Sequence, residues 1–167
     1  MSTRYRQRRC LPGALLLAVL VTGWAALPAT AAQTVEMTAA YRVNTGNAFV
    51  DTVLQDINHY VERHPQAFVD ELEWFANGNR RQMETWLAAE GHQGADLYFG
   101  CQLAMVIERS CAAVMAQFDA ATGGWQAVLD GLEPRLGRAQ WAQLEARMRD
   151  SYQRLARPLP AVAGKRR

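Results

Sequence analysis

Apolar side chains recur once per helical turn along most of this chain, and this pattern restricts it to an all-α fold. The clearest example follows the polar cluster at 44–47, where the apolar residues between Phe49 and Val61 fall at helical spacing. No segment shows the sustained alternation of apolar and polar residues that is typical of a half-buried strand. The sequence therefore predicts a small irregular bundle of about six to seven helices.

Proline and glycine breaks divide the pattern into segments. On the second helix we expect Phe68, Leu72 and Phe75 to be buried, and the fourth helix, which has little polar surface, should be central. The predicted helices cover about 47–62, Pro65 to the break at 77–79, about 80–90, about 95–108, Ser110 to the break at 122–124, a short segment from Trp125 to Leu132, and about 138–157.

The first residues have the pattern of an export signal. Four arginines between 4 and 9 precede an apolar stretch from Leu11 to Ala26, and Ala29-Thr30-Ala31 supplies the small residues of a cleavage site. The apolar stretch is shorter than the roughly 20 residues that span a membrane. We therefore expect a signal peptide at 1–31, a single helical domain at 32–157, and a disordered basic tail at 158–167.

This signal places the mature protein in the bacterial periplasm or outside the cell. The Arg8-Arg9 pair is a partial twin-arginine pattern, so the sequence leaves open whether the general or the twin-arginine route is used. The mature chain contains no apolar stretch long enough for a transmembrane segment.

Removal of the signal changes the charge balance. The 18 basic and 16 acidic residues become 14 and 16, because the signal holds four arginines and no acid, and the net charge falls from +2 to −2. A weakly acidic, exported chain is not expected to bind nucleic acid. Residues 35–96 hold ten acids and four bases, whereas 133–167 hold three acids and nine bases. The basic end either neutralises the acidic half of its own domain or attracts an anionic partner.

A candidate interaction surface follows from this charge segregation and from one aromatic pair, provided that both of its members reach the surface. Trp86, Trp125 and Trp141 fall at core-facing positions, whereas Trp74 is expected to be exposed, and with Phe75 it could form a small apolar contact patch. The candidate surface therefore comprises Trp74, Phe75, Arg138, Arg147, Arg149, Arg154 and Arg157.

Two cysteines remain after export, Cys101 and Cys111, and an oxidising compartment favours a disulfide between them. A helix that continues to 108 would leave Cys101 about 11 Å from its end. Bridged Cα atoms lie within about 7 Å, so a bridge requires a sharp turn or an earlier helix end. A disulfide and two buried thiols both remain possible interpretations.

Catalytic, metal and cofactor signatures are absent from the sequence. Asp56, His59 and Glu62 are spaced for two metal ligands on one helix, which is too few for a site, and a solvated polar face is the simpler interpretation. The acids between Asp70 and Glu73 are of a kind that helix surfaces carry routinely. We therefore expect no catalytic residue, no bound metal and no cofactor.

The step Gly124-Trp125, followed by the apolar pair Val128-Leu129, resembles small exported helical proteins of proteobacteria. That resemblance implies export and a helical fold, but no activity. The residues themselves favour a non-catalytic binding protein that contacts a protein partner or an anionic envelope component through its basic C-terminal helix. Two alternatives remain: a peripheral binder of anionic envelope lipid, and an enzyme with a cleft lined by buried carboxylates or histidines.

Overall fold

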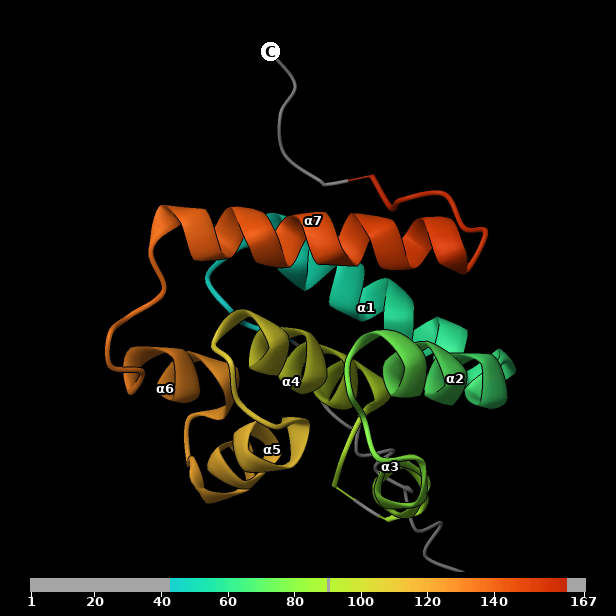
Figure 1. Cartoon of the computed structure of the whole chain (residues 1–167), viewed down its shortest axis with the longest axis horizontal. Coiled ribbons are helices and arrows are strands. Elements are labelled where there is room, and N and C mark those ends of the chain that lie inside the picture. The colour runs from blue at the N-terminus through green and yellow to red at the C-terminus, as the bar shows by residue number, and fades with distance from the viewer. Residues whose placement is uncertain (1–42, 90, 162–167) are drawn as a thin grey trace, which may run out of the picture. The chain divides into compact units, whose positions relative to one another are not determined.

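The computed structural model describes residues 43–89 and 91–161, which fall in a single unit of the chain. Within these residues there are seven helices and no strand, so the predicted all-α bundle is confirmed (Figure 1). The helices are α1 (Ala48–Arg63), α2 (Pro65–Phe75), α3 (Arg80–Ala88), α4 (Gly94–Val106), α5 (Cys111–Ala120), α6 (Gly124–Asp130) and α7 (Arg138–Arg154).

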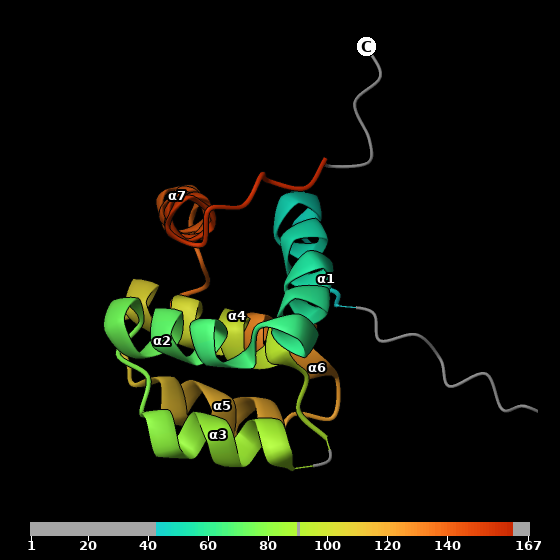
Figure 2. The ribbon, with the colours of Figure 1, turned by 90° about the vertical axis from the view of Figure 1, so that its right-hand side faces the viewer.

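Helix α4 forms the centre of the bundle, as its apolar composition predicts. It contacts α1, α5 and α7, and twelve of its thirteen residues are buried, Met105 being the exception. Figure 1 shows α4 between α7 and α5, and in the turned view of Figure 2 α3 and α5 again lie below α2 and α4. The helix with the least polar surface thus lies where its neighbours remove most of that surface from water.

Three helices begin at polar side chains that hold the first free backbone amides. Asn47 Oδ1 accepts hydrogen bonds from the amides of Phe49 and Val50. Asn79 and Ser110 accept in the same way from Gln82 and Ala113 at the starts of α3 and α5. These caps explain why the polar clusters before the apolar runs mark helix starts.

Helices α4 and α7 end in the same way, at a left-handed residue that turns the chain back sharply. Glu108 (φ +55°) follows α4, and the amide of Arg109 donates to the carbonyl oxygen of Ala104 at 2.9 Å. Ala156 (φ +51°) follows α7, and the amide of Arg157 donates to the carbonyl of Tyr152 at 2.9 Å. Both are Schellman ends.

Three helices end earlier than the sequence predicts, and the left-handed turns end two of them, α4 and α7. Helix α3 ends at Ala88 rather than 90, α4 at Val106 rather than 108, and α7 at Arg154 rather than 157. The early end of α4 supplies the sharp turn that a bridge requires. Cys101 and Cys111 form a disulfide with their Cα atoms 4.4 Å apart, which joins α4 to the start of α5.

Trp125 anchors α6 in the core, as its spacing predicts. Its indole is 3% exposed, stacks on Phe118 at 4.5 Å between ring centroids and meets the ring of Phe99 edge-on at 4.7 Å. Its Nε1 donates to Asp96 at 2.8 Å, so the polar atom of this buried side chain has a partner. A Cβ on Gly100 would lie 2.5 Å from Met115 Sδ and 3.2 Å from Trp125 Cη2, so glycine permits this close packing.

The apolar side chains along one face of α7 pack against the core of the bundle. Leu144, Met148 and Tyr152 are completely buried, and Trp141 and Leu155 pack against the same core while remaining partly exposed. The part of the chain that the structure describes contains no helix long and apolar enough to cross a membrane. The predicted signal peptide at 1–31 lies outside the described residues, and so does the predicted tail beyond 161.

Candidate functional site

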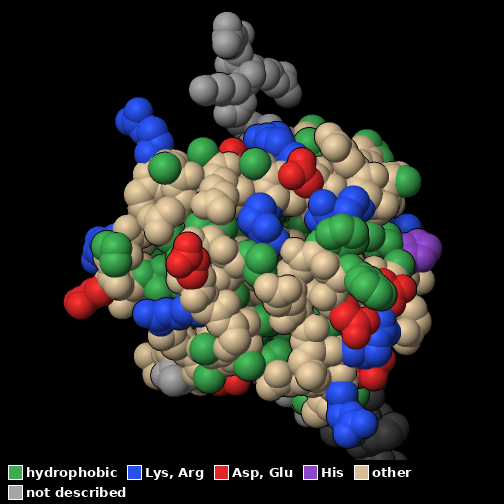
Figure 3. All heavy atoms as spheres, viewed as in Figure 1, with side chains coloured by type: hydrophobic (Ala, Val, Ile, Leu, Met, Phe, Trp, Pro, Cys, Tyr) green, Lys and Arg blue, Asp and Glu red, His purple; other side chains and the backbone are tan. Residues whose placement is uncertain are grey.

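The candidate surface is centred on two aromatic residues at the C-terminal end of α2. Trp74 is 75% exposed, as predicted, and Phe75 is 46% exposed. The prediction that Phe75 is buried is therefore wrong: Phe75 is the last residue of α2, and its ring is only partly covered. Figure 3 shows hydrophobic side chains gathered on the side of the molecule where α2 lies, with charged side chains around them.

A hollow of about 380 Å³ lies beside Trp74, and we call it the Trp74 hollow. Helix α2 supplies most of its wall, and the end of α7 supplies the rest. Its lining residues are Ala67, Asp70, Glu71, Trp74, Phe75, Arg154 and Leu155. Apolar and charged residues thus line the hollow together, and protein contact surfaces commonly combine the two.

Glu71 and Arg154 form the ion pair that joins α2 to α7 in this hollow. The Glu71 side chain is only 3% exposed, and Arg154 Nε donates to both of its carboxylate oxygens at 3.1 Å. The Arg154 guanidinium also lies over the ring of Phe75, with its carbon 4.0 Å from the ring centroid. The hydrogen bonds to Glu71 raise the pKa of Arg154. Arg154 therefore fixes both the buried acid and the exposed aromatic ring.

Asp70, at the edge of the Trp74 hollow, is held from the opposite side. It pairs with Arg80 at the start of α3, and Arg80 also contacts Glu73 with a nitrogen–oxygen distance of 2.6 Å. Both acids that line the hollow are thus paired with arginines of the same chain.

Arg147 extends the surface along α7. Its Nε donates to Gln102 Oε1 at 2.9 Å, and its Nη2 donates to the carbonyl oxygen of Phe75 at 2.7 Å. Burial lowers the pKa of Arg147, and the positive charge of Arg154 lowers it further. A smaller hollow of about 110 Å³ lies between Phe75 and these two arginines, with Asp150 at its edge.

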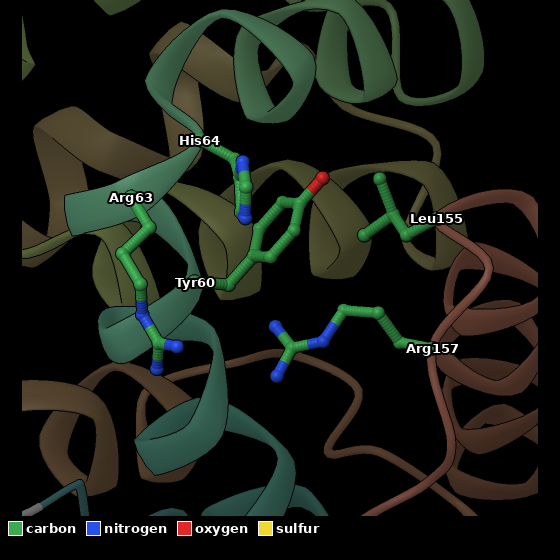
Figure 4. Close-up of a pocket in the computed structure, with 5 residues that line it drawn as sticks. All are labelled: Tyr60, Arg63, His64, Leu155 and Arg157. Atoms are coloured by element: carbon green, nitrogen blue, oxygen red, sulfur yellow. The ribbon is translucent and has the colours of Figure 1, made fainter.

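Arg157 lies at a separate pocket, which we call the Arg157 pocket. This cavity of about 280 Å³ is lined by Tyr60, Arg63, His64, Leu155 and Arg157 (Figure 4). Arg157 Nη2 lies 2.8 Å from Asp56 Oδ2, and its guanidinium carbon lies 4.7 Å from the centroid of the Tyr60 ring. Leu155 lines both this pocket and the Trp74 hollow, so the two are neighbours.

Two of the predicted surface arginines do not join this cluster. Arg149 pairs with Glu145 one turn earlier on α7 and lies over the ring of Phe49 at 4.1 Å. Arg138 is exposed at the first residue of α7, at the end of that helix opposite to Arg154. The structure therefore brings Trp74 and Phe75 together with Arg147 and Arg154.

Glu71 is buried, although the sequence pattern predicted it to be one of several surface acids. A usable signal existed, because Glu71 lies three residues after Phe68 and next to Leu72, on the helix face that those residues bury. A carboxylate on a buried face requires a cation, and the basic C-terminal helix is the obvious source. That argument would have predicted the contact between α2 and α7.

Of the three α1 residues considered for metal binding, Asp56 has partners elsewhere in the bundle, whereas His59 Nδ1 and Glu62 Oε2 lie 3.9 Å apart on the surface. Asp56 accepts a hydrogen bond from Tyr152 Oη at 2.6 Å and pairs with Arg157, whereas His59 and Glu62 are exposed. Among the described residues, no group of three or more histidine, cysteine or acidic side chains is arranged to hold a metal ion.

Comparison with protein-family models, with curated proteins and with solved structures gives no match for this chain.

Proposed function

We propose that this chain is a non-catalytic, exported binding protein that recognises a protein partner through the Trp74 hollow. The observation that carries the proposal is the 75% exposure of Trp74 beside a hollow of about 380 Å³. A tryptophan left in water forgoes a large gain in burial free energy, and tryptophans in such positions are frequently the anchors of protein interfaces. The partner inserts an apolar side chain into the hollow and covers Trp74 and Phe75.

The rigidity of the surroundings supports this proposal. Arg154 and Arg147 are held by Glu71, Gln102 and the carbonyl oxygen of Phe75, so the charged rim is ordered before a partner arrives. A preorganised rim reduces the side-chain entropy that is lost on binding. Because these arginines are already bonded within the chain, the affinity for the partner comes mainly from burial of the aromatic residues and not from net positive charge.

Export is part of the same proposal. The disulfide between Cys101 and Cys111 fits an oxidising compartment, as does the signal pattern in the sequence. Secretion into the periplasm or the medium would bring the Trp74 hollow to envelope proteins.

The two alternatives have weaker support. Lipid binding by the last helix would need its aromatic side chains, Trp141 and Tyr152, at the surface, yet Tyr152 is completely buried and bonded to Asp56. The enzyme alternative calls for a cleft lined by buried carboxylates or histidines. The buried carboxylate in the Trp74 hollow is bound by Arg154, and the histidine of the Arg157 pocket, His64, is exposed.

The test compares three forms of the purified protein as bait for envelope extracts: wild type, Trp74→Ser, and Leu159→Ser as a matched control. Leu159 is 40% exposed, so its replacement removes an exposed apolar side chain elsewhere. We expect a protein that is retained by wild type and by L159S and is lost with W74S. Its affinity, measured with the purified partner, should fall about 30-fold in W74S.

Two outcomes would contradict the proposal. Equal retention of the same protein by wild type and W74S would show that the hollow is not the contact surface. Binding to vesicles of anionic phospholipid that is lost with W74S, with no protein retained, would favour the lipid-binding alternative.

A further inference from the structure

The Arg157 pocket combines cationic groups from two separate parts of the chain. Arg63 stands at the end of α1, next to His64, and Arg157 follows the left-handed turn after α7. Figure 4 shows the Arg157 guanidinium pointing across the pocket toward the side where Arg63 lies, with the Tyr60 ring between His64 and Leu155. The turn at Ala156 and the end of α1 therefore bring these positive groups to one cavity.

The positive charge in the Arg157 pocket is only partly neutralised. Asp56 pairs with Arg157, whereas Arg63 makes one hydrogen bond in the described part of the chain, from Nε to the carbonyl oxygen of His59 at 3.3 Å. With Asp56 counted against Arg157, the positive charge of Arg63 remains. Helix α1 ends and α2 begins at His64. The negative end of the α1 dipole and the positive end of the α2 dipole therefore oppose each other there, and the side chains set the sign of the electrostatic potential in the pocket.

Arg157 also has an unused hydrogen-bond donor. Its Nη2 contacts Asp56, but its Nη1 is enclosed by the protein and has no acceptor among the described residues. A guanidinium presents its donors in a fixed planar fork that fits the oxygens of carboxylates and phosphates. An oxygen atom supplied by a ligand would satisfy this donor after a small movement of the side chain.

We propose that the Arg157 pocket binds a small oxyanion, a phosphate or a carboxylate group, between Arg63 and Arg157. The volume of about 280 Å³ suits a compact anion with a short organic body. The Tyr60 ring and Leu155 form the apolar part of the wall, so they contact that body. This site does not depend on the Trp74 hollow, and it adds a small-molecule ligand to the proposed protein partner.

The test uses amide chemical shifts of the isotope-labelled protein during titration with inorganic phosphate, glycerol phosphate or succinate. Chloride at matched ionic strength controls for general screening. We expect saturable shifts at residues 60–64 and at Arg157 with at least one of the three anions. Inorganic and glycerol phosphate acting without succinate would assign the ligand as a phosphate, and succinate acting without them would assign a carboxylate.

Two arginine variants test whether the anion binds in the Arg157 pocket rather than elsewhere on the surface. Arg63→Gln should weaken the affinity about tenfold or more, because it removes a charged donor from an exposed side chain whose Nε donates to the carbonyl oxygen of His59 in its own helix. Arg81→Gln, on the exposed surface of α3, is the matched control and should leave the affinity unchanged. The proposal is overturned if none of the three anions gives saturable shifts at these amides, or if R63Q binds as tightly as wild type. Trp74→Ser should bind the anion normally, so failure here and failure of the protein-partner proposal can be told apart.

Discussion

Arg154, at the last residue of α7, covers the carboxylate of Glu71, which is only 3% exposed in the middle of α2. The contact joins two residues 83 positions apart in the chain. A second pair, Arg157 with Asp56, joins α1 to the segment after α7. Part of the charge segregation seen in the sequence is therefore resolved inside the domain, where basic residues of the C-terminal end neutralise acids of the first two helices.

Removal of Arg154 should destabilise the protein far more than removal of an exposed arginine. Arg154→Met leaves Glu71 buried without a cation, and we expect the free energy of unfolding in urea to fall by about 2–3 kcal/mol. This value is below that for a fully buried pair, because the Arg154 side chain is 31% exposed and water can partly replace it.

Two further variants complete the Arg154 experiment. The double variant Glu71→Met with Arg154→Met should recover most of the loss, since no unpaired charge remains. Arg149→Met, which breaks an exposed pair with Glu145, should cost no more than about 1 kcal/mol. A single R154M variant as stable as R149M would show that Glu71 does not depend on its partner.

The left-handed residue after α7 predicts a stabilising glycine substitution. Ala156 has φ +51°, a conformation that costs a residue with a Cβ about 1 kcal/mol. Ala156→Gly should therefore raise the free energy of unfolding by up to about 1 kcal/mol. The same change at exposed Ala146, within α7, should lower it by about 1 kcal/mol, and equal signs for the two variants in thermal unfolding would contradict the assigned helix end.

The disulfide between Cys101 and Cys111 should be detectable in solution. Under denaturing, non-reducing conditions the full chain should show one reactive thiol, that of Cys10, and the exported form should show none. Reduction should lower the free energy of unfolding by about 2–3 kcal/mol, because the bridge closes a loop of about ten residues. Two reactive thiols in the exported form would exclude the bridge.

Buried tyrosines should make the protein sensitive to alkali. Burial raises the pKa of Tyr152, and its hydrogen bond to Asp56 raises it further. In the unfolded chain tyrosine ionises near pH 10, so the contribution of Tyr152 to stability is complete below about pH 10 and is lost as the pH rises above it. Unfolding in urea at several pH values should show this decline.

Tyr152→Phe isolates the contribution of this hydroxyl. Because phenylalanine does not ionise, the variant should lose stability above about pH 10 less steeply than wild type, by about 1.4 kcal/mol per pH unit. At neutral pH it should be less stable by about 1 kcal/mol, since the hydrogen bond to Asp56 is lost. Identical slopes for the two proteins would refute the assigned cause.

Local patterns in the sequence were sufficient for the helices and for much of the core. The side chains of Asn47, Asn79 and Ser110 mark three helix starts, because each accepts a hydrogen bond from a backbone amide within the first helical turn. The central position of α4 and the exposure of Trp74 also followed from spacing, because helical periodicity shows which residues share a face.

Only the tertiary structure decided which charged residues meet. Whether Arg154 binds a partner or Glu71, and whether Arg157 reaches Asp56, depends on how α7 crosses α1 and α2, and no local pattern encodes that crossing. The Arg157 pocket exists for the same reason, since it joins residues 60–64 to residues about ninety positions later. Periodicity fixes the burial of side chains through neighbours three or four residues away, whereas an ion pair or a pocket requires distant segments to pack at one particular angle.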